Sequence, residues 1–139
     1  MTDRDFVEQK VKLIKSDLQE LKELKPANWE IFLEKKHQRY LCEHLLEHII
    51  NRAIDINNHI IVESKKSPPD SYESSFLILA ELKILPTGLA QKISKSAGLR
   101  NRLTHDYDDI KFDIFYQSIS DCLTQYPLYL RRILKSLEK

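Results

Sequence analysis

The chain has 139 residues and a formal net charge of +1, with 31% of its residues charged and 42% hydrophobic. A net charge this small excludes a global attraction to nucleic acid or to membranes, so any site for a polyanion must be local. Only two glycines and five prolines are present; this composition favours helices over a sheet with many turns, and the length suits one domain spanning residues 1–139.

The first predicted helix runs from Thr2 or Asp3 to Leu24. Its apolar residues recur at steps of three and four and therefore share one helical face: Val7, Val11, Ile14, Leu18 and Leu21. Pro26 ends this helix, because a proline disfavours the α conformation in the residue before it.

A long second helix is predicted from the N-cap residue Asn28 to Glu63 or Ser64. One of its faces is apolar: Cys42, Leu45, Ile49, Ala53, Ile56 and Ile60. At the usual rise per residue such a helix is on the order of 50 Å long. A compact four-helix domain of this size does not need that length, so we expect part of the helix to pack against another subunit.

The segment "SKKSPPD" is the clearest predicted loop, since Pro68 and Pro69 stop the second helix. The third predicted helix, "SYESSFLILAEL", is apolar enough to be mostly buried. A fourth helix has Pro86 in its first turn and runs toward His105. The carboxylates of "DYDDI" oppose the negative end of a helix dipole, and we interpret them as its stop signal.

A fifth helix is predicted from Phe112 to Leu137, with a kink at Pro127. The sequence shows no internal repeat and no low-complexity segment. We therefore predict an all-α fold, an antiparallel bundle of four to five helices.

The two cysteines and the N-terminus favour a cytoplasmic protein. Cys42 and Cys122 both fall in apolar helical patterns and are predicted to be buried free thiols, which suits a reducing compartment. The segment "MTDRDFVEQK" is charged from its third residue, unlike a signal peptide. No apolar run approaches the roughly 18 residues of a membrane span.

The segment "HLLEH" matches the H-x-x-E-H pattern of inverted zinc peptidases. His44 and His48 would share a helical face and could hold one metal, with Glu47 as the base. A catalytic zinc also needs a third protein ligand, and no later residue marks one. The polar face of a long helix is the simpler interpretation, and we expect no metal site.

The same helix carries further polar residues. His44, His48, Asp55 and His59 form a stripe, which Arg52 and two asparagines flank: Asn51 and Asn58. A solvated surface accounts for this stripe, and the lining of a cleft is the alternative interpretation.

The stretch "AGLRNRLTHDYDD" is more polar than a core helix needs. Asn101 and His105 share a helical face, whereas Arg100 and His105 are about 140° apart around an ideal helix. A histidine can act as general acid or base near neutral pH, and an arginine holds a phosphate with a fork of donors. The pair suits metal-free RNA cleavage, in which two copies would make a fuller site. On spacing alone, ordinary ion pairs of Arg100 and Arg102 with the aspartates are the simpler interpretation.

These residues resemble a known family. The segment "RNRLTHDY" is similar to the R-x4-H-x-Y motif of HepT-type toxins, which belong to the HEPN superfamily of helical ribonucleases. "GLAQKISKSAGLRN" resembles the run into that motif, and "AIDINNHII" resembles the family's acidic and histidine-bearing helix. Helix order and chain length also agree, so the resemblance covers nearly the whole chain. It implies a HEPN-like homodimer whose two motifs meet in a cleft that cuts RNA without a metal.

The resemblance also assigns roles to individual residues. It implies that Arg100 and His105 are catalytic, that Asn101 supports them, and that Tyr107 accepts AMP. The partner would be an MntA-type minimal nucleotidyltransferase antitoxin that takes the AMP from ATP, while this chain itself needs no cofactor. The added anion would compete with RNA phosphate for Arg100 and block the cleft. Three further residues carry over only as positions near the cleft, without an assigned role: Asp55, His59 and Arg102.

Three other functions stay open at this point. The chain could be a non-catalytic helical binding subunit that presents substrate or nucleotide to a separate nucleotidyltransferase. That subunit would share every sequence feature except the need for His105 as an acid or base. The other two alternatives are the zinc peptidase and a structural bundle without any site.

Overall fold

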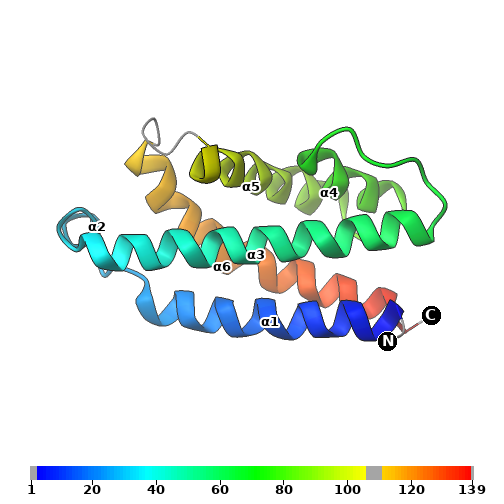
Figure 1. Ribbon diagram of the computed structural model, residues 1–139, viewed down its shortest axis with the longest axis horizontal. Helices are drawn as coiled ribbons and strands as arrows, with labels where there is room; N and C mark the ends of the chain where they lie inside the picture. The colour runs from blue at the N-terminus through cyan, green and yellow to red at the C-terminus, as the bar shows by residue number, and fades with distance from the viewer. Residues whose placement is uncertain (1–2, 106–110, 139) are drawn as a thin grey trace.

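The computed structural model describes residues 3–105 and 111–138, with the backbone alone for residues 101–105. Within those residues the chain forms six helices and no strand (Figure 1): α1 (Asp3–Leu24), α2 (Trp29–Glu34), α3 (Lys36–Glu63), α4 (Tyr72–Glu81), α5 (Thr87–His105) and α6 (Phe112–Ser136). The predicted all-α class is therefore confirmed.

Helix α3 is the central element of the bundle. It contacts every other helix, with α1 on one side and the α4–α5 hairpin on the other (Figure 1). The two ends of the chain lie at the same end of the bundle (Figure 1), where Nη1 of Arg4 donates to the carbonyl oxygen of Leu137 at 3.1 Å. Among the described residues, no helix is both long and apolar enough to cross a membrane.

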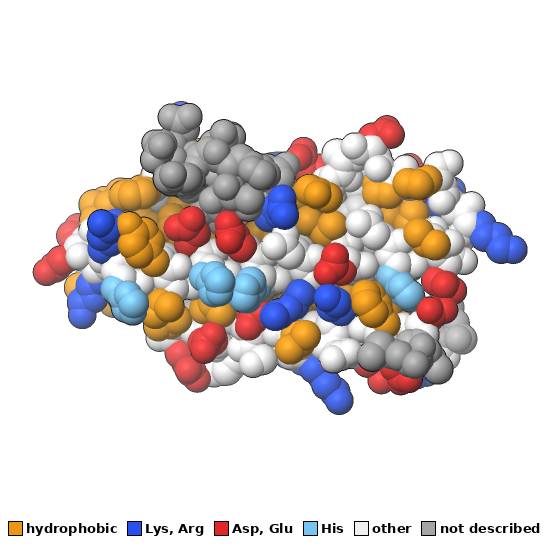
Figure 2. Space-filling view, in the orientation of Figure 1, with side chains coloured by type: hydrophobic (Ala, Val, Ile, Leu, Met, Phe, Trp, Pro, Cys, Tyr) orange, Lys and Arg blue, Asp and Glu red, His pale blue; other side chains and the backbone are white. Residues whose placement is uncertain are grey.

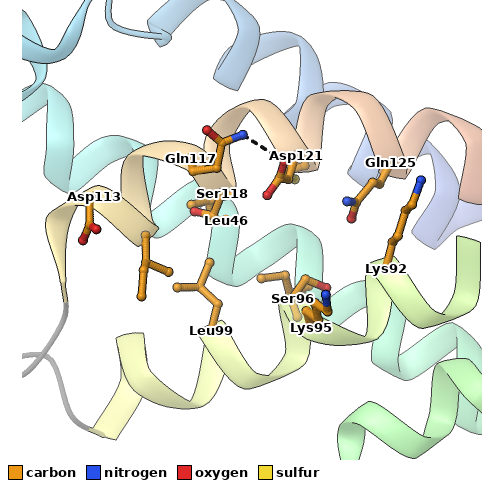
Figure 3. A pocket seen from close by; sticks show the side chains of 13 residues that line it. Leu46, Lys92, Lys95, Ser96, Leu99, Asp113, Gln117, Ser118, Asp121 and Gln125 are labelled. Carbon is orange, nitrogen blue, oxygen red and sulfur yellow. Dashed lines mark hydrogen bonds between the residues drawn. The ribbon is translucent and has the colours of Figure 1, made fainter.

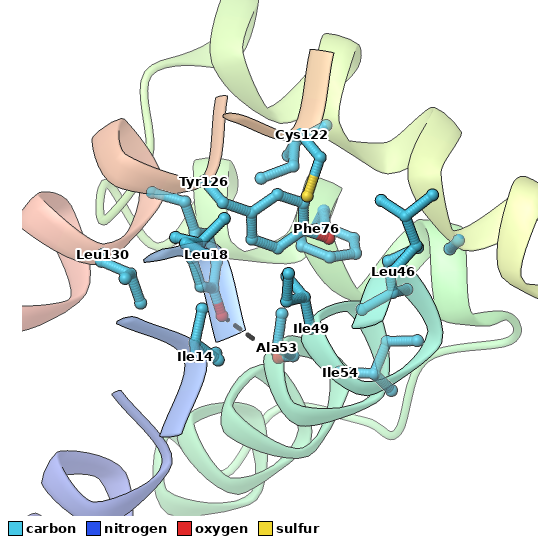
Figure 4. Close-up of a cluster of buried hydrophobic side chains, with 14 of the residues drawn as sticks. Ile14, Leu18, Leu46, Ile49, Ala53, Ile54, Phe76, Cys122, Tyr126 and Leu130 are labelled. Carbon is cyan, nitrogen blue, oxygen red and sulfur yellow. Dashed lines mark hydrogen bonds between the residues drawn. The ribbon is translucent and has the colours of Figure 1, made fainter. Parts of the chain in front are cut away.

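The core fills the space between the helices, with buried residues from all six of them; Figure 4 shows the part formed by α1, α3, α4 and α6. The five apolar residues predicted for α1 are all buried. Both cysteines are buried and free, as predicted. Burial raises the pKa of the Cys42 thiol to about 11 and raises that of the Cys122 thiol further still. Both thiols therefore stay protonated near neutral pH and are poor nucleophiles.

The long second helix of the prediction is in fact two helices. Asn28 is an N-cap as predicted, since its Oδ1 accepts from the backbone N–H of Ile31 at 2.9 Å, but this cap starts only the short helix α2. The helical path breaks at Lys35 (φ −92°, ψ 78°), and α3 begins at Lys36. The break lets Phe32 turn inward and become fully buried.

Aromatic packing explains this break. The Phe32 ring lies 5.1 Å from the ring of Tyr116 and 5.3 Å from that of Phe115, measured between centroids. Arg39 then stabilises the bend, because its Nη1 donates to the carbonyl oxygens of Phe32 and Leu33 at 3.0 and 2.6 Å. The apolar pattern of this segment alone does not predict the break, because the residues that pack against α2 belong to α6.

The other helices need smaller corrections. Pro86 immediately precedes α5 and its carbonyl accepts from the N–H of Ala90 at 3.0 Å, so the helix starts one residue later than predicted. Helix α4 is not mostly buried, since Tyr72 and Leu77 are 43% and 40% exposed. Helix α6 continues through Pro127 as one element, and the kink there stays a prediction. The carboxylates of "DYDDI" from Asp106 to Asp109 lie outside the described residues.

A buried chain of hydrogen bonds links α6, α3 and α4. The Tyr129 hydroxyl donates to Oδ1 of Asn57 at 2.6 Å and lies 3.1 Å from the carbonyl oxygen of Ala53. Nδ2 of Asn57 donates to Oγ of Ser75 at 3.0 Å, and that hydroxyl donates to the carbonyl oxygen of Tyr72 at 2.7 Å. Burial raises the pKa of the Tyr129 phenol, so its hydroxyl stays a donor.

Replacing Asn57 with Ala is therefore expected to lower the free energy of unfolding by about 2–4 kcal/mol, because it leaves buried partners unsatisfied and opens a cavity. Urea denaturation measures this change. The matched control is Asn58→Ala, since Oδ1 of Asn58 is buried without a hydrogen-bond partner in the described part of the chain. That variant should be as stable as the parent protein, and equal losses in both variants would contradict the role of the network.

Candidate active site

Arg100 lies where three helices meet. It is carried by α5 and is half-buried. Its Nε donates to Oδ1 of Asn51 on α3 at 2.6 Å. Its guanidinium carbon lies 5.2 Å from the centre of the Tyr72 ring, which stands in the first turn of α4. The arginine of the R-x4-H element is thus held by two residues that are far from it in sequence.

The remaining motif residues are described less fully. The backbone of α5 is helical through His105, so the expected separation of about 140° between Arg100 and His105 applies to one copy of the chain. The side chains of three predicted site residues lie outside the described residues: Asn101, Arg102 and His105. Tyr107, the predicted acceptor of AMP, lies outside them entirely.

The polar stripe of α3 mostly contacts α1. Nζ of Lys10 lies 3.1 Å from Oδ2 of Asp55, and Arg52 forms an ion pair with Asp17. Neither contact includes Arg100. Within one copy, this part of the stripe and the α5 motif are therefore separate, and the placement of Asp55 beside a cleft stays a prediction.

His59 also packs on α1, near the end of the bundle that holds the termini. Its ring stacks on Phe6 with centroids 4.7 Å apart, and its Nε2 lies 3.2 Å from Oδ1 of Asp3 without hydrogen-bond geometry. Glu63 adds a carboxylate within 4.8 Å of these atoms. These contacts serve the α1–α3 interface, so a role of His59 in the cleft also stays a prediction.

The "HLLEH" segment lies along the outer face of α3. Figure 2 shows the histidines of the described residues in a row along this helix, with both signs of charge around them. The rings of His44 and His48 lie 4.1 Å apart. The three-residue group in the described chain that could hold a metal is Asp3, His59 and Glu63, and it includes neither of these histidines. The described residues therefore offer the zinc-peptidase interpretation no third ligand.

A pocket of about 460 Å³ separates α5 from α6 (Figure 3). Its floor is apolar and includes Leu46 and Leu99, while Lys92 and Asp121 stand at its rim. Arg100 is not among the lining residues. The pocket thus opens on another side of α5 from the one that carries the contacts of Arg100 with α3 and α4.

Sequence reasoning missed the partners of Arg100. The sequence predicts for Asn51 only a place beside the polar stripe, and it predicts no role for Tyr72. The one sequence signal for Asn51 is an amide among the polar residues of a helix that also carries a buried apolar face. No spacing rule could connect Tyr72 with Arg100, because α4 and α5 form a hairpin whose register depends on packing.

The family model described as "Ribonuclease HepT-like" matches residues 14–133 of this chain. The chain belongs to the HepT-like ribonuclease family. The predicted relationship to the HepT-type family is thereby confirmed, and the description of the family agrees with the predicted assignment as a ribonuclease. This HepT-like chain is 39% identical over 128 residues to the tRNA nuclease HepT of Aphanizomenon flos-aquae, covering 92% of this chain and 87% of the relative.

Two further comparisons give one more distant relative in sequence and one similar fold. The mRNA nuclease HepT of Shewanella oneidensis is 29% identical over 85 residues, which cover 61% of this HepT-like chain and 64% of the relative. The fold is similar to that of the tri-AMPylated Shewanella oneidensis HEPN toxin, solved in complex with an MNT antitoxin. That comparison has a TM-score of 0.85 at 24% identity, and covers 98% of this chain and 99% of the other.

Proposed function

We propose that this HepT-like ribonuclease is the toxin of a toxin–antitoxin pair, an RNA endonuclease that acts in the cytoplasm as a homodimer. The family assignment and the relatives named as tRNA and mRNA nucleases support the activity. The observation that carries the proposal for this chain is the position of Arg100. It is half-buried and oriented by neighbouring helices, as a phosphate-binding group requires.

The proposed reaction uses the two motif residues on one phosphodiester. His105 takes the proton from a ribose 2′-OH, whose oxygen attacks the adjacent phosphorus. The bond from phosphorus to the 5′-oxygen of the next nucleotide breaks and leaves a 2′,3′-cyclic phosphate, and the 5′-oxygen takes a proton from water, to which His105 later returns the proton that it accepted. Arg100 stabilises the charge that develops on the phosphate oxygens. Asn101 supports the pair as a neighbouring hydrogen-bonding group.

Two copies of the chain complete the site in this proposal. Because the backbone of α5 is helical through His105, the positions of Arg100 and His105 in one copy lie about 140° apart around the helix axis. A second copy placed against the end of α5 brings another Arg100 and His105 to the same cleft. A homodimer therefore supplies the convergence that a single helix does not provide.

Control by AMP transfer follows from the position of Tyr107. A cognate nucleotidyltransferase antitoxin binds ATP, and the phenolic oxygen of Tyr107 attacks the α-phosphorus while pyrophosphate leaves. The AMP group adds a negative charge two residues beyond His105, where it competes with RNA for Arg100. The Shewanella toxin, which is tri-AMPylated and bound to an MNT antitoxin in its solved structure, supports this form of control.

The proposed mechanism needs no metal, because the proton transfer and the charge stabilisation both come from side chains. RNA cleavage is therefore expected to continue at an unchanged rate after dialysis against a chelator, as measured with purified protein and labelled RNA. Adenylyl transfer by the antitoxin serves as the control, since nucleotidyl transfer from ATP normally uses Mg²⁺. Loss of cleavage with the chelator, and its recovery on adding back a divalent cation, would contradict the mechanism.

A further inference from the structure

Two residues from outside the motif fix the orientation of Arg100. Nε of Arg100 donates to Oδ1 of Asn51 at 2.6 Å, and the guanidinium carbon lies 5.2 Å from the centre of the Tyr72 ring. Asn51 is half-buried, and Tyr72 is 43% exposed. We refer to Asn51 and Tyr72 together as the Arg100 clamp.

Because the guanidinium group is planar and rigid, these two contacts restrain its orientation. The group has five N–H donors in one rigid plane, and two of its edges can each bind a pair of oxygens. Asn51 engages Nε, and therefore one of those two edges. That contact limits how the guanidinium can turn when it meets a phosphate. The Tyr72 ring attracts the guanidinium through a cation–π contact and so restrains the plane itself.

Both members of the clamp stand on regular helices. Asn51 belongs to the central helix α3, and Tyr72 is the first residue of α4. A capping box fixes that first turn: Oγ of Ser71 accepts from the N–H of Ser74 at 3.1 Å, and Oγ of Ser74 accepts from the N–H of Ser71 at 3.0 Å. The carbonyl of Tyr72 also accepts from Ser75, a member of the buried network. The backbone of Tyr72 is thus tied to the buried network.

We infer that Asn51 and Tyr72 are positioning residues of the ribonuclease site, which hold the guanidinium of Arg100 in its orientation for the scissile phosphate. This inference rests on the proposed function, because it requires that Arg100 act on that phosphate. An arginine oriented in advance loses less side-chain freedom when it meets the transition state. The clamp should therefore affect kcat more than KM.

Kinetics of RNA cleavage test the inference. Asn51→Ala is expected to lower kcat roughly tenfold while KM changes less than about twofold, since substrate contacts stay in place. Asn58→Ala removes an amide from the same helix without touching Arg100 and should keep the parent kcat. Tyr72→Leu should lower kcat roughly threefold, whereas Tyr72→Phe keeps the ring and should retain the activity.

A double-substitution experiment separates positioning from general support of the fold. In an Arg100→Lys background the Nε donor is absent, so Asn51→Ala should cause no further loss of kcat. A merely structural role would lower the rate equally in both backgrounds. The Nε–H signal of Arg100 in ¹⁵N-resolved NMR spectra gives a readout without catalysis. Its protection from solvent exchange should be lost in Asn51→Ala and kept in Asn58→Ala.

The outcomes for the inference and for the proposed function are distinct. If Arg100→Ala cleaves RNA at the parent rate, the proposed function fails and the clamp has no role. If Arg100→Ala is inactive while Asn51→Ala and Tyr72→Leu keep the parent kcat, only the inference is overturned. If Asn51→Ala does not fold, the Tyr72 variants test the inference: a lower kcat in Tyr72→Leu than in Tyr72→Phe supports it, and equal kcat values in the two variants overturn it.

Discussion

Replacing His105 or Arg100 with Ala is expected to abolish RNA cleavage without unfolding the protein. A lost general base and a lost charge-stabilising group each typically reduce the rate by at least a hundredfold, so each single variant should lose at least this much. Growth arrest in cells that produce the protein should disappear in both variants. Purified protein and a labelled RNA give the rates, and thermal unfolding shows that the fold is kept.

Matched controls make this experiment specific to the motif. His44→Ala removes an exposed histidine of α3, and Arg132→Ala removes an exposed arginine of α6. Both variants should cleave RNA at the parent rate. Full activity of His105→Ala would refute the proposed acid–base role, and would favour the alternative of a binding subunit that presents substrate or nucleotide to a nucleotidyltransferase.

Replacing Tyr107 with Phe is expected to free the toxin from its antitoxin. Incubation of the parent protein with the cognate nucleotidyltransferase and ATP should add mass in steps of one AMP and suppress cleavage. The Tyr107→Phe variant lacks the phenolic oxygen that attacks ATP, so it should gain no AMP and keep its activity. Intact-mass spectrometry and the cleavage assay measure the two results on the same samples.

Tyr40→Phe is the control for this second experiment, because Tyr40 is an exposed tyrosine outside the motif, at 53%. That variant should accept AMP and lose activity as the parent protein does. Peptide mapping then locates the modified residue. AMP found on a residue other than Tyr107 would refute the proposed acceptor, even if the total mass gain agreed with the scheme.

The helices could largely be predicted from local patterns. The apolar stripe of α1 predicted its buried face, because steps of three and four leave one side of a helix away from water. Asn28 predicted a helix start, because its side chain satisfies a backbone N–H within the same turn. These signals depend on residues within a few positions of one another, and so they are present in the sequence itself.

Features that depend on distant residues could not be predicted in this way. The break at Lys35 reflects packing of Phe32 against Tyr116, more than eighty positions away. The same limit applies to the site. The motif could be found by its resemblance to the HepT-type family, but the contacts of Arg100 with Asn51 and Tyr72 join three separate helices. Such contacts follow from the packing of the whole bundle.

The buried series of hydrogen bonds depends on a residue that is synthesised late. It starts at Tyr129 in the last helix and ends at the carbonyl of Tyr72, whose ring lies against Arg100. A chain still being translated has α3, α4 and α5 before it has Tyr129. The hydrogen bonds behind the Arg100 clamp are therefore complete only after the last helix has been synthesised, so the site cannot reach its final form before then.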